Sequence, residues 1–379
     1  MTTSVEPGSQ EERPGLSRLP GPLYVNGRFL RQPQSGVHRY AMELMRQWDR
    51  MLGEGELEAE RESVVILAPG ALAGDSPFEN VPVRAVGRLS GNLWEQVDLP
   101  RSTVGHRLFS PCNSAPWIKS HGQLVTIHDA SVFAAPDTYS FAYLAKHRLL
   151  CRRFARTASK VITVSEFSKR ELVRWCGIAP DRIEVIYSGC EHILSQPADP
   201  GILERTGMGS RPLVLGMGSH GLHKNIAAVL ELQPLLDRLG LDLAIVGGRG
   251  SGVFRSVRYE QERGAHWLGS VSDRELRFLY EHAALLVFPS LYEGFGLPPL
   301  EAMACGCPVV LSNAASLPEI GGPDALYCDP RDRGSLAQAV EAVLSDAALR
   351  KRLSDMGRQR ARRFNWRDCA LQTWRAVQA

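Results

Sequence analysis

The sequence predicts an α/β protein made of two doubly wound domains that face each other across a cleft. From Leu23 onward, short apolar runs alternate with helical stretches, which is typical of βαβ units around a parallel sheet. This rhythm stops once, at residues 195–201, where a polar stretch with two prolines and a glycine predicts an interdomain linker. The length of 379 residues also exceeds what a single core usually supports.

In the first half, each apolar run is short enough to form one buried strand. The expected strands are 23–28, 63–69, 124–129, 160–165 and 183–188. The expected helices are 36–51, 139–158 and 166–176. Residues 1–21 are polar and rich in proline and glycine, so we expect a disordered tail there and a first domain over residues 22–194.

The second half repeats the pattern. The expected strands are 212–217, 242–247, 284–290 and 308–312, and the expected helices are 224–239, 272–282, 298–305 and 333–345. Residues 347–378 predict two further helices. We expect a second domain over 195–360 and a C-terminal helix within 361–379 that packs back toward the first domain. Ligands of open parallel sheets bind beyond the carboxyl ends of the strands, which places the site in the cleft.

Composition excludes several classes of protein. Apolar residues make up 44% and charged residues 22%, which is typical of globular proteins. Lys and Arg number 44 against 41 for Asp and Glu, and this near-balance disfavours a nucleic-acid binder. The eight cysteines are scattered, and Cys305 and Cys307 alone cannot complete a tetrahedral zinc site, so reduced thiols are expected.

No apolar run is long enough to span a bilayer, and the first 21 residues lack the apolar core of a signal peptide. We therefore expect a cytoplasmic protein whose only membrane contact is peripheral, at the inner face of the membrane.

The segment PSLYEGFGLPPLEAMACGCPVV (residues 289–310) is the most informative part of the sequence. Glu293 lies in a loop after a buried strand, and Glu301 lies several residues into the following helix. Gly294 and Gly296 allow a sharp turn and a close approach to a ligand.

The same helix begins with Pro298 and Pro299, which suit a first turn. Its N-terminus favours phosphate, while carboxylates on either side suit sugar and ribose hydroxyls. The spacing therefore predicts a site for a sugar–diphosphate–nucleoside. Taken singly, Glu293 could be an ordinary loop charge and Glu301 an ordinary helix acid.

This segment resembles the E-x7-E segment of the retaining glycosyltransferases of family four, which have the GT-B fold of two Rossmann-like domains. The resemblance extends over nearly the whole chain, through SGVHRYAMEL (35–44), TIHDASVFAAPDTY (126–139), VITVSEFSKREL (161–172), HKNI (223–226) and HWLGSVSDRELRFLYEHAALLVFPS (266–290). It implies transfer with retention of anomeric configuration, without a DxD-bound metal and without a cofactor. No DxD triplet occurs here.

The resemblance also implies roles for single residues. Glu293 resembles the residue that contacts the transferred sugar, Glu301 the one that holds the ribose diol, and Lys224 the one that neutralises the diphosphate. His128 resembles the histidine beside the sugar at the reaction centre. The remaining candidates for donor binding are Gly36, Gly218, His223, Arg249, Gly294, Phe295, Gly296 and Leu297.

Two of these candidates depart from the family pattern. His223 stands where many relatives have arginine, and Gly218 where some have another arginine. These departures predict that Lys224 and backbone amides neutralise most of the charge of the diphosphate. Arg249 would stack on the nucleobase.

The implied activity is hexosyl transfer, with GDP-mannose and UDP-glucose as candidate donors. The acceptor would be a saccharide or a lipid-linked intermediate of polysaccharide or glycoconjugate synthesis. A sugar-nucleotide epimerase on the same fold and an inactive binding module are alternatives. An NAD-dependent oxidoreductase using GMGSHG (216–221) is a third, although this reading leaves Lys224 and both glutamates without a role.

Two further features stay open. Asp129, after His128, could orient the histidine or cap a turn. A basic stretch over residues 146–160 could be a solvated helix face or could contact anionic lipid, since Leu144, Leu149, Leu150 and Phe154 give that helix an apolar side.

Overall fold

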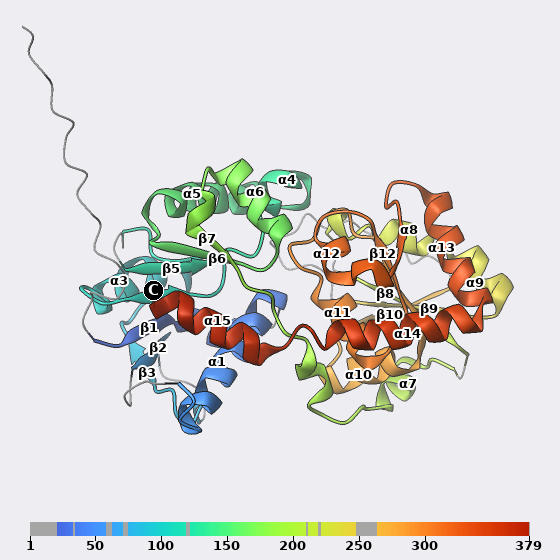
Figure 1. The fold of residues 1–379 in the computed structure, drawn as a ribbon, viewed down its shortest axis with the longest axis horizontal. Coiled ribbons are helices and arrows are strands. Elements are labelled where there is room, and N and C mark those ends of the chain that lie inside the picture. Colours follow the sequence, from blue (N-terminus) through green and yellow to red (C-terminus); the bar gives the residue numbers. More distant parts are fainter. Residues whose placement is uncertain are drawn as a thin grey trace, which may run out of the picture.

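The computed structural model describes residues 21–32, 35–57, 63–70, 75–118, 122–209, 211–218, 221–247 and 264–378. Within these residues the chain forms two α/β halves that lie side by side (Figure 1). The chain passes between the halves ahead of α7 (Gly201–Thr206), and it returns between α14 (Ala347–Ala361) and α15 (Trp366–Gln378).

The first half contains a seven-stranded parallel sheet in the order β3-β2-β1-β4-β5-β6-β7 among the described residues. Its strands are β1 (Leu23–Asn26), β2 (Val64–Pro69), β3 (Val83–Val86), β4 (Leu108–Ser110), β5 (Gln123–Thr126), β6 (Lys160–Thr163) and β7 (Ile183–Val185). Its helices are α1 (Gly36–Gly53), α2 (Gly91–Leu93), α3 (Leu99–Ser102), α4 (Ser131–Ala134), α5 (Phe141–Thr157) and α6 (Glu166–Cys176).

The second half contains a six-stranded parallel sheet in the order β10-β9-β8-β11-β12-β13 within the described part. Its strands are β8 (Leu213–Met217), β9 (Asp242–Val246), β10 (Ala265–Gly269), β11 (Ala283–Phe288), β12 (Val309–Ser312) and β13 (Leu326–Cys328). Besides α7 and α14, its helices are α8 (Ile226–Leu230), α9 (Gln233–Leu239), α10 (Asp273–His282), α11 (Leu297–Cys305), α12 (Leu317–Gly321) and α13 (Arg333–Ser345).

Two doubly wound parallel sheets agree with the predicted fold class. The sequence missed short or irregular strands, namely β3, β4, β10 and β13. β3 lies at the sheet edge and exposes Arg84, so it has no continuous apolar run. The helix expected over 224–239 was wrong as one element. Asn225, whose φ of 55° is left-handed, lies before α8, and the helix breaks again at residues 231–232. The next helix, α9, begins just ahead of Pro234, which has no N–H.

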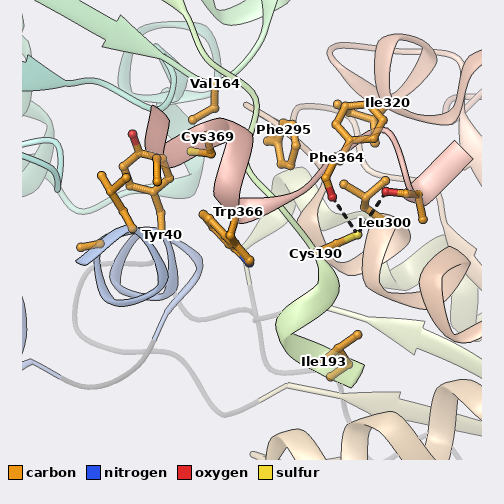
Figure 2. Packing of buried hydrophobic residues seen from close by; sticks show 14 of the residues in the cluster. Tyr40, Val164, Cys190, Ile193, Phe295, Leu300, Ile320, Phe364, Trp366 and Cys369 are labelled. Atoms are coloured by element: carbon orange, nitrogen blue, oxygen red, sulfur yellow. Dashed lines mark hydrogen bonds between the residues drawn. The ribbon is translucent and has the colours of Figure 1, made fainter. Parts of the chain in front are cut away.

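One apolar cluster joins the two halves. Figure 2 shows Tyr40 and Val164 of the first half together with Phe295 of the second, around Trp366. The returning helix α15 packs on α1, where the indole N–H of Trp48 donates to the carbonyl of Ala370 at 2.9 Å. The C-terminal helix thus packs against the first half.

The eight cysteines form no disulfide, and all except Cys112 are buried. Burial raises the pKa of the Cys305 thiol to about 12, which keeps it protonated at neutral pH. Among the described residues, no helix is long and apolar enough to cross a bilayer.

Candidate functional site

The loop between β11 and α11 carries Glu293 at the carboxyl end of its sheet. Lys224 follows β8, the neighbour of β11, and its Nζ lies 2.6 Å from Oε1 of Glu293. Both side chains are largely shielded, with 19% and 12% of their surface exposed. The ammonium also lies 5.4 Å from the centroid of the Phe288 ring. Two candidate residues far apart in sequence therefore form one charged pair.

The segment around Lys224 is fixed by its neighbours. The side-chain amide of Asn225 donates to the carbonyls of Pro289 and Pro330 at 3.1 and 2.8 Å. The amide of Leu291 donates to the carbonyl of His223 at 2.8 Å. Gly218 packs against Lys224, since a Cβ at position 218 would lie 2.9 Å from the lysine Cβ. The residues on both sides of Lys224 are thus hydrogen-bonded to residues 289 and 291, just ahead of Glu293.

His223 is buried at the boundary between the halves. Its ring lies 6.3 Å from that of Tyr139, nearly parallel at 17°, so the two halves contact here. Burial, and secondarily the charge of Lys224, lowers the pKa of His223 to about 4. Without a ligand, the histidine is therefore neutral at physiological pH.

The glutamate loop is held from both halves through its carbonyl groups. Ser165 and Ser168, at the start of α6, donate to the carbonyl of Gly294 at 2.6 and 2.9 Å. From the second half, the hydroxyl of Ser316 lies 3.0 and 2.7 Å from the carbonyl oxygens of Glu293 and Phe295, which share its one proton. These hydrogen bonds hold the backbone at Glu293 and just after it, and Lys224 holds its carboxylate.

Gly294 brings this loop against the His-Asp segment. A Cβ at position 294 would lie 2.7 Å from the carbonyl oxygen of His128 and 2.8 Å from Cβ of Asp129. Only a residue without a side chain fits this approach, so contact between the halves explains this glycine. Gly294 has no positive φ, so the turn itself does not require glycine here.

His128 is buried, and its Nε2 lies 3.1 Å from the carbonyl oxygen of Pro111. Because a carbonyl only accepts, Nε2 carries the proton of this hydrogen bond. Burial lowers the pKa of His128 to about 4. The ring contacts the Tyr40 ring edge-on at 4.8 Å. His128 is therefore a neutral, fixed imidazole, while Asp129 caps the following turn by accepting from the amide of Ser131 at 2.8 Å.

Helix α11 begins at Leu297, after Gly296 with a φ of 112°. Pro298 and Pro299 have no N–H, so the N–H groups at this helix start belong to Gly296 and Leu297. The number of amides available for a phosphate is smaller than a proline-free helix would give.

Glu301 lies in α11 and is buried among protein groups. Its Oε1 is 2.9 Å from Nε2 of His192, and its Oε2 accepts from the hydroxyl of Tyr280 at 3.2 Å. The indole N–H of Trp366 donates to Nδ1 of His192 at 3.0 Å, which places the proton of the neutral ring on Nε2. Nε2 lies near the Glu301 carboxylate, but its N–H is not aligned for a hydrogen bond. The two glutamates thus have different partners: Glu293 a lysine, Glu301 a histidine and a tyrosine.

The other candidates differ in how they lie. Gly36 begins α1, and a Cβ there would meet nothing within 4 Å. Arg249 lies outside the described residues. No group of three or more His, Cys, Asp or Glu residues that could hold a metal is found in the described part of the chain.

The sequence analysis did not identify several residues that contact this site, because no motif marks them. Ser165 could have been found, since its side chain accepts from the amide of Ser168 at the start of α6, which makes it an N-cap. Glu319 of α12 accepts from the amides of Glu166 and Phe167 at 2.7 and 3.1 Å and from the hydroxyl of Tyr187 at 2.7 Å. It therefore links α12 to the first half.

Comparison with known families accounts for both halves. The model described as Glycosyl transferases group 1 matches residues 205–360, and Glycosyltransferase Family 4 matches residues 34–194. The O-antigen chain mannosyltransferase B of Escherichia coli is 33% identical over 260 residues, which is 66% of this chain and 68% of that protein. The chain belongs to the group 1 glycosyltransferases. It is a glycosyltransferase enzyme with the GT-B fold.

Two solved structures show the same fold. A sucrose-phosphate synthase from Thermosynechococcus elongatus has a TM-score of 0.70 at 20% identity, covering 94% of this chain and 98% of that one. Anabaena HepE in complex with UDP-glucose has a TM-score of 0.67 at 18% identity, with the same coverage. Two further mannosyltransferase relatives match over 54% and 63% of their own lengths.

Proposed function

We propose that this glycosyltransferase moves a hexosyl group, mannosyl in the first instance, from a nucleoside diphosphate sugar to a saccharide or lipid-linked acceptor. The Lys224–Glu293 pair carries the proposal, because the two residues lie at the carboxyl ends of β8 and β11. The loop that holds Glu293 also contacts the His-Asp segment of the other half. The mannosyltransferase relative supports mannose, and the UDP-glucose complex of the structural neighbour keeps glucose as the alternative.

Lys224 is suited to the leaving diphosphate. An ammonium has three N–H donors, so the one directed at Glu293 leaves two for phosphate oxygens. Partial burial strengthens its attraction for the charge that develops as the glycosidic bond breaks. Glu293 would orient the ammonium with one oxygen and accept from sugar hydroxyls with the other.

The nucleoside would lie at the other end of the loop, with Glu301 on its ribose diol. In this structure the Glu301 carboxylate faces His192 and Tyr280. Ribose binding therefore requires Glu301 to share or exchange one of these partners.

Retention of configuration and independence of metal belong to the same proposal. The acceptor hydroxyl attacks the anomeric carbon from the face that the diphosphate leaves, and its proton passes to a phosphate oxygen. The neutral imidazole of His128 positions the sugar and carries no charge into the reaction. Contact between the halves limits access of water, and hence hydrolysis of the donor.

A panel of nucleotide sugars tests the proposal. We expect GDP-mannose to raise the melting temperature most, followed by release of GDP in the presence of a mannoside acceptor with EDTA added. NMR of the product should show the anomeric configuration of the donor. Donor turnover without acceptor to an epimeric sugar, or an inverted product, would contradict it.

A further inference from the structure

One face of α5 exposes large apolar side chains to solvent. Residues 141, 145, 149, 152 and 156 recur every three or four positions and are all exposed, so they form one stripe along the helix. Phe141 is 85% exposed and Leu149 is 53% exposed. The stripe is apolar in the N-terminal part of the helix and basic at Arg152 and Arg156.

Of the apolar side that the sequence suggested, only Leu149 lies on this stripe. Leu150 and Phe154 are buried in the core of the first half, and Leu144 packs against it. Those residues hold α5 to the sheet. Phe141 and Leu149 have no such role, because the stripe points away from the core.

A second element extends the apolar surface. Trp117 and Ile118 are 37% and 72% exposed. Arg153 donates from Nε to the carbonyl of Trp117 at 3.2 Å, which places this loop beside α5. A tryptophan and an isoleucine therefore lie next to the basic part of the stripe. Figure 1 shows α5 beside α6, on the outside of the first half.

The charge on this surface has one sign. The seventeen residues of α5 include five Lys or Arg and no Asp or Glu. In the part of the chain that the structure describes, no carboxylate lies within ion-pair distance of Arg152 or Arg156. Cations without acidic neighbours beside exposed aromatic and aliphatic side chains match a surface with anionic groups outside and hydrocarbon beneath.

We propose that this docking face, formed by Trp117, Ile118, Phe141, Leu149, Arg152 and Arg156, binds the surface of an anionic lipid bilayer. The arginines contact lipid phosphates while the apolar side chains enter the boundary between headgroups and acyl chains. A row of rings then connects the face to the site: Tyr143 of α5 stacks on Tyr139 at 5.1 Å, and Tyr139 faces His223, next to Lys224. The face would hold the site near a lipid-linked acceptor, and this last step rests on the proposed function.

The test is co-sedimentation of the full chain with vesicles of phosphatidylcholine mixed with phosphatidylglycerol, against phosphatidylcholine alone. We expect binding to the mixed vesicles that weakens as salt is raised. Arg152→Glu with Arg156→Glu should weaken it by tenfold or more, since each basic residue near such a surface contributes roughly fivefold. Phe141→Ser with Leu149→Ser should weaken it by about tenfold.

Matched controls come from other faces. Val104→Ser with Leu239→Ser changes two exposed apolar residues, and Arg352→Glu with Arg375→Glu makes the same charge change on α14 and α15. Both controls should bind vesicles like the unchanged protein. Absence of binding to the mixed vesicles, or equal losses in the controls, would overturn the inference. So would a Phe141/Leu149 variant that loses self-association in ultracentrifugation but keeps its vesicle binding, since the face would then join two copies.

Donor turnover with a soluble acceptor separates this inference from the proposed function. Vesicle binding without turnover by any nucleotide sugar would refute the proposed function alone. Turnover that survives the loss of vesicle binding in the docking-face variants is the expected result, and turnover with no vesicle binding in the unchanged protein would refute the docking face alone.

Discussion

Nε2 of His192 lies 2.9 Å from Oε1 of Glu301, and both side chains are buried, at 3% and 7% exposed. His192 belongs to the segment that crosses between the halves, and its other nitrogen accepts from Trp366 at the return crossing. The acid proposed for the ribose thus contacts the first crossing directly and the return crossing through His192.

Glu301→Gln should weaken donor binding by tenfold or more, because a neutral amide accepts hydrogen bonds from hydroxyls less strongly than a carboxylate does. Isothermal titration with the preferred nucleotide sugar checks this. Asp355→Asn, which alters an exposed acid paired with Lys351, is the control and should leave affinity unchanged. Equal affinity in the Glu301 variant and the control would contradict the ribose role.

His192→Phe should destabilise the fold by about 1–3 kcal/mol, since the buried Glu301 carboxylate would keep only its hydrogen bond from Tyr280. Urea unfolding measures the loss. In the double variant with Glu301→Gln, much of the loss should be recovered, because a buried neutral amide is less costly to leave without a hydrogen-bond donor than a buried carboxylate is. Additive losses would show that the two side chains act independently.

Lys224→Ala should lower kcat by about a hundredfold or more with the fold intact, because the leaving diphosphate loses its fixed cation. Single-turnover release of nucleotide is the measurement, with circular dichroism for the fold. Lys351→Ala removes an exposed lysine and should be silent. Unchanged turnover in the Lys224 variant would show that the diphosphate binds elsewhere.

The sequence predicted that Lys224 and Glu293 serve one ligand, but not that they contact each other. Their proximity depends on β8 and β11 being neighbours in the sheet, and strand order is set by packing that no local pattern reports. The pairing of Glu301 with His192 was missed for a similar reason, since it depends on where the crossing segment runs. The two sheets were predictable because their buried strands are apolar runs. Edge strands such as β3 were not, because their residues are half exposed.

Acidification should destabilise the protein between about pH 6.5 and pH 4. Burial lowers the pKa of three histidines to about 4, below the value of about 6.5 expected in the unfolded chain. They are His128, His223 and His147 of α5, whose ring stacks on Tyr143. As pH falls through this window, the unfolded state takes up protons first, so stability present above pH 6.5 is lost, on the order of 3 kcal/mol for each histidine. His223→Phe retains a ring for Tyr139 and should reduce the pH dependence measured by urea unfolding. An unchanged slope would show that His223 titrates normally.

Glu319→Ala should loosen the contact between the halves while leaving donor binding to the second half nearly intact. The carboxylate of Glu319 accepts from two amides at the N-terminus of α6 and from Tyr187, and charged hydrogen bonds of this kind contribute about 1.5–3 kcal/mol each. Its loss should raise hydrogen exchange at Glu166 and Phe167 and lower kcat, since transfer requires both halves to be in contact. Glu319→Gln keeps the acceptor oxygen without the charge and should give an intermediate effect. The donor candidates Lys224, Glu293 and Glu301 all lie in the second half, so their contacts do not depend on Glu319. If donor affinity fell by the same factor as kcat, Glu319 would support the donor site itself and not the contact between the halves.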